Sequence, residues 1–278
     1  MTIARPRTVA DALDALGALP GAQLLAGGTD LMVEINFGRR SPDDIVALRR
    51  VAELGAFEVG EEVVLGAGVT YSVLEHDLAD ELPALAAAAR TVGSPQIRNA
   101  GTVGGNVGTA SPAGDTLPVL AALDASVTLA GPEGDRTLPL DAFITGPKRT
   151  AIRPGELIRD VRFRRPRGPQ LFLKVGPRNA MVISVACCAV VVDADRRRVG
   201  IGLGSVGPRP LRATAAEDAL APLVDWDALR ADRDAIQRAA ALSAEAAEPI
   251  TDHRATADYR RHCVGVLVER ALTRGLEP

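Results

Sequence analysis

In the N-terminal part of the chain, short segments with helical spacing of apolar residues alternate with short strand-like segments. Residues 8–18 (TVADALDALGA) repeat apolar positions at helical spacing behind a threonine suited to cap a helix. Residues 23–26 and 43–48 are short apolar runs typical of strands, and residues 30–37 between them have a helical pattern. A strand, a helix and a strand at this spacing predict a small parallel β-α-β unit.

The pattern changes in the following segment, where strand-like alternation replaces it. Residues 57–71 (FEVGEEVVLGAGVTY) alternate and turn in the manner of antiparallel hairpins. Residues 82–92 predict a helix, and a loop with a short helix follows in the stretch 111–125. Residues 126–131 and 136–143 return to a strand pattern. We therefore expect strands and helices in mixed order here.

The C-terminal part begins after the sequence PRGP (166–169), which predicts a linker. Strand patterns then occupy about 170–176, 182–193 and 198–206. The rest of the chain is predicted to be helical.

Two signals mark the helices of this last part. Thr214 and Glu217 have the spacing of a capping box at a helix start. A long alanine-rich stretch covers residues 225–248, and a final amphipathic helix is expected from about 255 to 274. The sequence therefore predicts a helical layer behind the C-terminal strands.

Together these patterns predict an α+β protein of two domains. The first domain is bipartite, formed by residues 1–55 and 56–167, and the smaller second domain comprises residues 168–278, with an antiparallel sheet and a helical layer. The 278 residues are 47% hydrophobic but only 3% aromatic, so the core must consist mainly of Val, Leu, Ile and Ala.

Charge and hydropathy exclude some classes of protein. The net charge is −3 and the arginines are scattered, whereas a nucleic-acid-binding surface needs a concentrated basic stripe. The longest apolar run, residues 181–192, is too short to span a bilayer, and the first residues lack the apolar segment of a signal peptide. We expect a cytoplasmic protein.

The three cysteines do not form a metal-binding pattern. Cys187 and Cys188 are adjacent in an apolar strand pattern, so their side chains should point to opposite faces of a sheet. Cys263 lies far along the chain, and no CxxC motif occurs. We expect buried thiols, no metal site and no iron–sulfur cluster in this chain, since a cluster needs about four cysteine ligands.

Two glycine pairs are the strongest candidates for a ligand site. Gly27-Gly28 (in LLAGGTDL) and Gly104-Gly105 (in RNAGTVGGNVG) each follow a short strand-like run. Successive N–H groups at a glycine turn can form a concave site for an anion, although each pair taken alone is more often a structural turn. Hydroxyl, amide and carboxylate groups flank the pairs: Thr29, Asp30, Thr102, Asn106 and Asp115. Thr29 and Asp115 are also suited to cap helices. Two such pairs suggest one phosphate-containing ligand held from two sides.

A third glycine-rich stretch is rejected as a ligand site. GLGSVG (202–207) matches the letters of a dinucleotide-binding fingerprint, but the last glycine of that fingerprint must open a helix. Pro208 and Pro210 follow instead. We interpret this stretch as a strand end and turn.

The ordered motifs resemble one known family. AGGTDL, IRNAGTVGGNVGTASPAGDTLPVLAALDA, GELI, LFLKVGPRNAMVISV and TDHRATADYRRHCVGVLVERAL are similar to the FAD-binding subunit of molybdenum hydroxylases, a group that includes xanthine dehydrogenases and aerobic carbon monoxide dehydrogenases. The resemblance covers essentially the whole chain. It implies a bipartite FAD-binding domain of the PCMH type, in which two glycine turns hold the pyrophosphate of a non-covalently bound FAD.

The resemblance also implies individual site residues. Asp115 would hold a hydroxyl group of FAD, Ile158 would pack on the flavin ring and Lys174 would approach the ring. Two positions depart from relatives: Val92 replaces an aromatic residue and Ala180 a tyrosine that shields the flavin. The residues expected along the phosphates and the ribityl chain are Leu25, Ala26, Gly27, Gly28, Thr29, Asp30, Leu31, Thr102, Val103, Gly104, Gly105 and Asn106.

The family resemblance implies an electron-transfer role without a catalytic acid or base in this chain. A molybdopterin-containing large subunit would oxidise the substrate, a small subunit with 2Fe-2S clusters would relay electrons, and FAD would pass them to an external acceptor. The partners would form a heterotrimer or two heterotrimers related by a two-fold axis. Two alternatives remain open: a self-contained FAD oxidase acting on an alcohol or amine, and a cofactor-free scaffold subunit.

Overall fold

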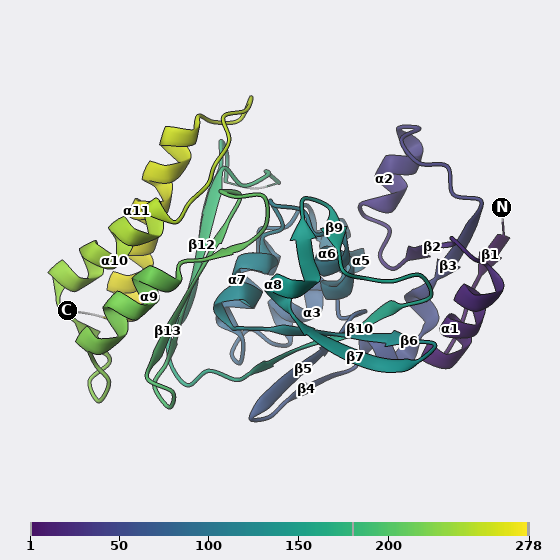
Figure 1. The fold of residues 1–278 in the computed structure, drawn as a ribbon, viewed down its shortest axis with the longest axis horizontal. Coiled ribbons are helices and arrows are strands. Elements are labelled where there is room, and N and C mark those ends of the chain that lie inside the picture. The colour runs from purple at the N-terminus through teal and green to yellow at the C-terminus, as the bar shows by residue number, and fades with distance from the viewer. Residues whose placement is uncertain (1, 180, 277–278) are drawn as a thin grey trace.

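The computed structural model describes residues 2–179 and 181–276. The three larger sheets follow one another along the long axis of the molecule, with the N-terminus at one end and the C-terminal helices at the other (Figure 1). Within the described residues, no helix is both long and apolar enough to cross a membrane.

The first sheet is a small parallel sheet at the N-terminal end. Its order is β1-β3-β2. The predicted β-α-β unit is present, and β1 adds a strand that the sequence pattern did not indicate. The capping box that starts α1 is formed by Thr8 and Asp11. The elements of this part are β1 (Thr2–Ala4), α1 (Val9–Ala18), β2 (Gln23–Leu25), α2 (Leu31–Asn36), β3 (Asp44–Ala47) and two 3₁₀ helices, η1 (Leu48–Arg50) and η2 (Ala52–Gly55).

The second sheet is antiparallel, with the order β4-β5-β10-β6-β7. Its central strand is β10 (Leu157–Arg164), which the sequence patterns did not predict. The remaining elements are β4 (Phe57–Val59), β5 (Glu62–Gly66), α3 (Tyr71–His76), α4 (Pro83–Arg90), α5 (Pro95–Ala100), α6 (Val103–Thr109), α7 (Thr116–Ala122), β6 (Ser126–Gly131), β7 (Gly134–Pro139), α8 (Leu140–Phe143), β8 (Ile144–Gly146) and β9 (Arg149–Thr150).

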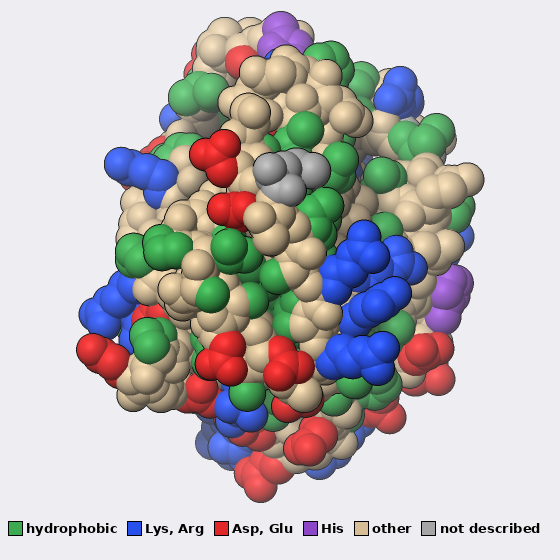
Figure 2. All heavy atoms as spheres, turned by 90° about the vertical axis from the view of Figure 1, so that its right-hand side faces the viewer, with side chains coloured by type: hydrophobic (Ala, Val, Ile, Leu, Met, Phe, Trp, Pro, Cys, Tyr) green, Lys and Arg blue, Asp and Glu red, His purple; other side chains and the backbone are tan. Residues whose placement is uncertain are grey.

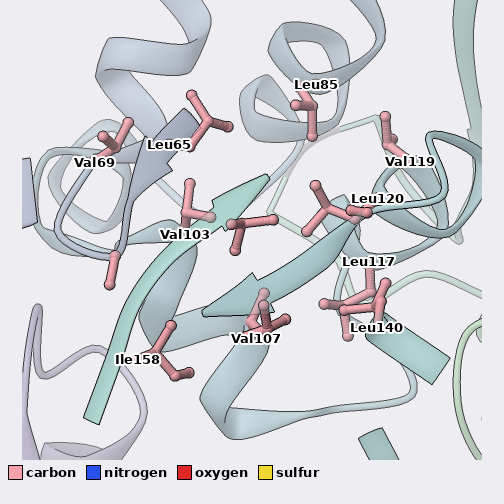
Figure 3. Packing of buried hydrophobic residues seen from close by; sticks show 14 of the residues in the cluster. Leu65, Val69, Leu85, Val103, Val107, Leu117, Val119, Leu120, Leu140 and Ile158 are labelled. Carbon is pink, nitrogen blue, oxygen red and sulfur yellow. The ribbon is translucent and has the colours of Figure 1, made fainter. Parts of the chain in front are cut away.

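The main hydrophobic core lies between this sheet and the helices that cover it. Leu65 of β5 and Ile158 of β10 face Val103 and Val107 of α6, while Leu120 extends the core along α7 (Figure 3). These side chains are aliphatic, as the low aromatic content predicts. The core fixes α6, and α6 in turn forms part of the candidate site.

The third sheet has the order β11-β12-β13-β14 and is covered on both faces. Helices α4 and α7 pack on one face, and α9 and α11 pack on the other, where α10 lies against both of them (Figure 1). All eight residues of β12 are buried, which explains why all of them except Asp193 are apolar. The elements are β11 (Gln170–Val175), β12 (Ala186–Asp193), β13 (Arg198–Gly204), β14 (Leu211–Arg212), α9 (Thr214–Leu220), η3 (Ala221–Leu223), β15 (Val224–Asp225), β16 (Arg230–Ala231), α10 (Arg233–Glu245) and α11 (Ala257–Gly275).

Alternate side chains of β12 belong to two different cores. Cys187 packs into the core shared with the second sheet, and Cys188 packs into the core beneath the C-terminal helices. The predicted opposite orientation of the two thiols is therefore confirmed. Burial raises the pKa of the Cys188 thiol to about 12.

The rejected glycine motif is used for packing. Gly202 and Gly204 lie in β13, directly against α7. A Cβ atom at Gly202 would lie 1.8 Å from the carbonyl oxygen of Pro118. The interpretation of this stretch as strand and turn is confirmed.

Two predictions for the helical layer are wrong. Thr214 does not cap α9, because the side chain of Glu217 turns to the sheet, where it accepts a hydrogen bond from Ile201 N at 2.7 Å and pairs with Arg212. The alanine-rich stretch begins with the hairpin β15–β16, so α10 starts only at Arg233.

Candidate functional site

A cavity of about 1550 Å³ lies between the N-terminal part and the second part of the chain. Its wall is formed by segments within residues 16–55, 67–71, 91–115, 148–158 and 181–183. Pockets for small molecules usually have roughly 300–1,000 Å³, so this one is large enough for an extended ligand.

Figure 2 views the molecule from the N-terminal end, where a group of Lys and Arg side chains lies beside more dispersed acidic ones.

The first glycine pair is in the loop between β2 and α2, which forms one wall of the cavity. A Cβ atom at Gly27 would lie 1.8 Å from the carbonyl oxygen of Ala100, so only glycine allows the loop to approach the end of α5. Gly28 has a φ angle of +74°, in the left-handed region that favours glycine. Both glycines of this pair are therefore required by the backbone.

The same loop presents a run of free backbone donors. Among the described residues, no acceptor is found for the N–H groups of residues 27–31, and the first helical bond runs from Met32 N to Gly28 O at 3.1 Å. These five residues all line the cavity. Successive N–H groups of this kind are suited to bind the oxygens of a phosphate.

The second glycine pair differs from the prediction. Gly104 and Gly105 are not in a turn but in the first turn of α6. The N–H groups of Val103 and Gly104 donate to the carbonyl oxygens of Val69 and Ala67 at 2.9 and 2.8 Å. The next two N–H groups, of Gly105 and Asn106, donate to Oγ1 and to the carbonyl oxygen of Thr102 at 3.0 and 2.9 Å.

The expectation that both pairs offer free N–H donors is therefore wrong for the second pair. Thr102 caps α6 rather than presenting its hydroxyl oxygen as a free group. A Cβ atom at Gly104 would lie 2.4 Å from that of Ala67, so this glycine allows α6 to pack on the end of β5. Val103 is buried in the core (Figure 3) and is not among the described residues that line the cavity.

Asp115 is the buried carboxylate of the cavity wall. Its Oδ2 atom accepts hydrogen bonds from Lys174 Nζ at 2.5 Å and from Thr91 Oγ1 at 3.0 Å. Its Oδ1 atom is buried and has no partner. Burial raises the pKa of Asp115, and the Lys174 ammonium and the Thr91 hydroxyl oppose that rise. The unpartnered oxygen is suited to accept a hydrogen bond from a ligand hydroxyl group.

Three other predicted residues occupy different positions around the cavity. Ile158 is buried in the core, and its side chain contributes to the cavity wall. The side chain of Asn106 is oriented by Thr116, whose Oγ1 donates to Asn106 Oδ1 at 2.5 Å. Lys174 is not among the described residues that line the cavity, and it reaches the site through Asp115.

The two positions that depart from relatives have different outcomes. Val92 lines the cavity, as do the partly exposed side chains of Met181 and Ile183. Ala180 lies outside the described residues.

Several residues at the site were not predicted. Thr91 and Tyr71 line the cavity near Asp115, and burial together with the charge of Asp115 raises the pKa of Tyr71. Glu34 of α2 binds Lys148 across the cavity rim, with 2.7 Å between Oε1 and Nζ. Glu34 and Lys148 are 114 positions apart, and no local sequence signal connects them.

The cavity fits a ligand that carries both phosphates and hydroxyl groups. The free N–H groups of residues 27–31 suit the phosphates, and the unpartnered Oδ1 of Asp115 suits a hydroxyl group. FAD has both kinds of group and an extended shape. The residues present therefore fit FAD, with one set of phosphate donors instead of the two expected.

Comparison with protein families gives two matches along the chain. Residues 1–166 match the family described as FAD binding domain in molybdopterin dehydrogenase, and residues 172–274 match the CO dehydrogenase flavoprotein C-terminal domain.

Individual relatives are similar over nearly their whole length. The carbon monoxide dehydrogenase medium chain of Hydrogenophaga pseudoflava is 32% identical, over 96% of this chain and 94% of the relative. The xanthine dehydrogenase FAD-binding subunit of Escherichia coli O157:H7 is 29% identical, over 97% and 94%. Among solved structures, the reconstituted CO dehydrogenase from Oligotropha carboxidovorans has a similar chain, with a TM-score of 0.89 and 32% identity over 99% of this chain and 97% of that one.

Proposed function

Because the chain belongs to the family of FAD-binding domains of molybdopterin dehydrogenases, we propose that it is the electron-transfer subunit of a molybdenum-containing hydroxylase or dehydrogenase. When bound, FAD supplies the redox chemistry that connects an iron–sulfur subunit with an external electron acceptor. The chain's own residues bind and orient the cofactor.

The run of free N–H groups in the cavity is the observation that supports this proposal most directly. Residues 27–31 would hold the pyrophosphate, because their N–H groups have no acceptor among the described residues. Asp115 would accept a hydroxyl group of the cofactor through Oδ1. On the opposite wall, Thr102 and Asn106 would shape the cavity, and Ile158 would give an apolar surface for the ring.

The proposed partners are a small subunit with 2Fe-2S clusters and a large subunit with the molybdenum cofactor. Support comes from the relatives, which carry names such as medium chain and FAD-binding subunit and which this chain matches nearly end to end. We propose the same division of labour here, in a heterotrimer or a pair of heterotrimers. No residue of this chain is assigned as a general acid or base.

Analysis of the purified protein tests the cofactor directly. We expect a yellow protein from which acid precipitation releases FAD, at about one FAD per chain. A colourless protein that takes up no FAD on reconstitution would contradict the proposal and favour a scaffold subunit.

The electron-transfer role is tested by comparing the isolated chain with the assembled enzyme. The chain is co-expressed with candidate iron–sulfur and molybdenum subunits. Each preparation is then mixed rapidly with aldehydes, N-heterocycles, carbon monoxide, alcohols and amines. We expect bleaching of the flavin absorption by substrate only in the assembly. Bleaching of the isolated chain at catalytic rates would instead identify a self-contained oxidase.

A further inference from the structure

A lysine of the C-terminal domain reaches the wall of the cofactor cavity. Lys174 lies on β11 of the third sheet, and Asp115 directly precedes α7. Their side chains form an ion pair with 2.5 Å between Nζ and Oδ2, and they are only 8% and 7% exposed. This buried pair joins the C-terminal domain to the cavity.

The two oxygens of the Asp115 carboxylate have different surroundings. Oδ2 receives both protein donors, Lys174 Nζ and Thr91 Oγ1, whereas Oδ1 is buried without a partner. Asp115 lines the cavity, but Lys174 is not among the described residues that do. The ammonium group therefore acts on a ligand through the carboxylate that it holds.

We propose that Lys174 is a positioning residue, which keeps Asp115 ionised and oriented so that Oδ1 is available to a hydroxyl group of bound FAD. The proposal rests on the FAD-binding role proposed above. It also gives the C-terminal domain a part in cofactor binding, through the ion pair of Lys174 with Asp115.

The groups around Asp115 determine how its pKa changes when Lys174 is removed. Thr91 at the end of α4, Tyr71 on α3, Cys187 on β12 and Lys174 on β11 act on or respond to its charge. The pKa values of Tyr71 and Cys187 are raised, so both groups stay neutral near neutral pH. Among these four residues, Lys174 supplies the positive charge that lowers the pKa of Asp115. Without it, the pKa of Asp115, which burial already raises, increases further.

Binding of FAD by the full-length chain, stripped of flavin, provides the test. FAD is titrated by the quenching of its fluorescence between about pH 6 and about pH 9, where an ordinary carboxyl group does not titrate. We expect Lys174→Met to weaken FAD binding by on the order of tenfold at the lower pH, because a protonated Asp115 loses a charge-assisted hydrogen bond. The defect should shrink as the pH rises. Wild type and Lys174→Arg should show no such slope.

A double-mutant cycle with Asp115→Asn identifies the route of the effect. We expect Lys174→Met to cause no further loss of affinity in the Asp115→Asn background. An equal loss in both backgrounds without a pH slope would overturn the proposal, because Lys174 would then contact FAD itself or support only the fold.

The double variant also covers the case in which Lys174→Met does not fold, since it leaves no unpaired charge buried. Equal FAD affinity of the double variant and Asp115→Asn then supports the proposal, and weaker binding by the double variant overturns it. A wild-type chain that binds no FAD would contradict the proposed function itself.

Discussion

In each glycine pair, one glycine lies against the backbone of a distant segment: Gly27 against Ala100, and Gly104 against Ala67. The pairs differ in the hydrogen bonding around them. Residues 27–31 form a loop whose N–H groups lack acceptors among the described residues, whereas residues 103–106 donate all four of their N–H groups within the protein. In this protein each glycine pair therefore marks a close approach of two backbones, and the neighbouring backbone decides whether N–H donors remain for a ligand.

The largest expected effect is a loss of stability on substitution of Gly104, which should not occur on substitution of Gly105. Gly104→Val should lower the free energy of unfolding by about 3 kcal/mol or prevent folding, because the new side chain meets Ala67 in the packed core. Gly105→Ala is the matched control, since its Cβ meets only Thr102 Oγ1, at 3.0 Å. It should change stability by less than about 1 kcal/mol. Urea unfolding measures both, and equal costs would show that packing does not distinguish these glycines.

The next largest effect is a loss of FAD retention on substitution of Gly27 in the first glycine pair. Gly27→Ala places a Cβ atom 1.8 Å from Ala100 O, so the N-terminal part must move away from α5. FAD retention should fall at least about tenfold, since the free N–H groups move with the loop. Gly17→Ala in α1 is the control, because its Cβ has open space, and it should retain FAD. Unchanged FAD content in Gly27→Ala would place the phosphate donors elsewhere.

A smaller effect is expected at the rejected motif. Gly204→Ala brings a Cβ atom within 2.6 Å of Cys187 Sγ and 3.0 Å of Pro118 Cγ. This overpacking should cost about 1–2 kcal/mol of stability. The FAD content per folded chain should not change, because β13 is not part of the cavity wall. Loss of FAD at unchanged stability would instead restore GLGSVG as a cofactor-binding motif.

The smallest effect is expected at the rim of the cavity. Lys148→Ala removes an ion pair with Glu34 that connects α2 to the β8–β9 turn. Lys148 is about half exposed, so FAD should dissociate less than about threefold faster, and the difference should disappear at high salt. Arg159→Ala is the control, since Arg159 and its partner Asp135 do not line the cavity. Stopped-flow release of FAD measures the rates.

Local sequence signals predicted several elements well. The Thr8 cap places the start of α1, and the apolar run of β12 predicts a strand buried on both faces. The family resemblance, carried by ordered motifs along the whole chain, is confirmed by the family matches. The sequence therefore predicts the structural role of a residue where that role depends on its immediate neighbours in the chain.

Contacts between distant segments were not accessible in the same way. Strand β10 became the centre of the second sheet only by pairing with β5 and β6, and Glu217 left its expected capping role to bind a strand amide. Lys174 was expected at the flavin ring but pairs with Asp115, 59 positions away. The predicted role of Lys174 as a direct cofactor contact stays a prediction.

The sequence by itself determined several of the helices and strands, because capping and alternation are local properties of a few residues. It also determined the family, because the ordered motifs are carried by the sequence itself. Only the tertiary structure decided which glycine pair keeps free N–H groups and which oxygen of Asp115 lacks a donor. A polar group is available to a ligand only when no other segment satisfies it. That condition depends on Val69, Ala67 and Lys174, which reach the site from elsewhere in the fold.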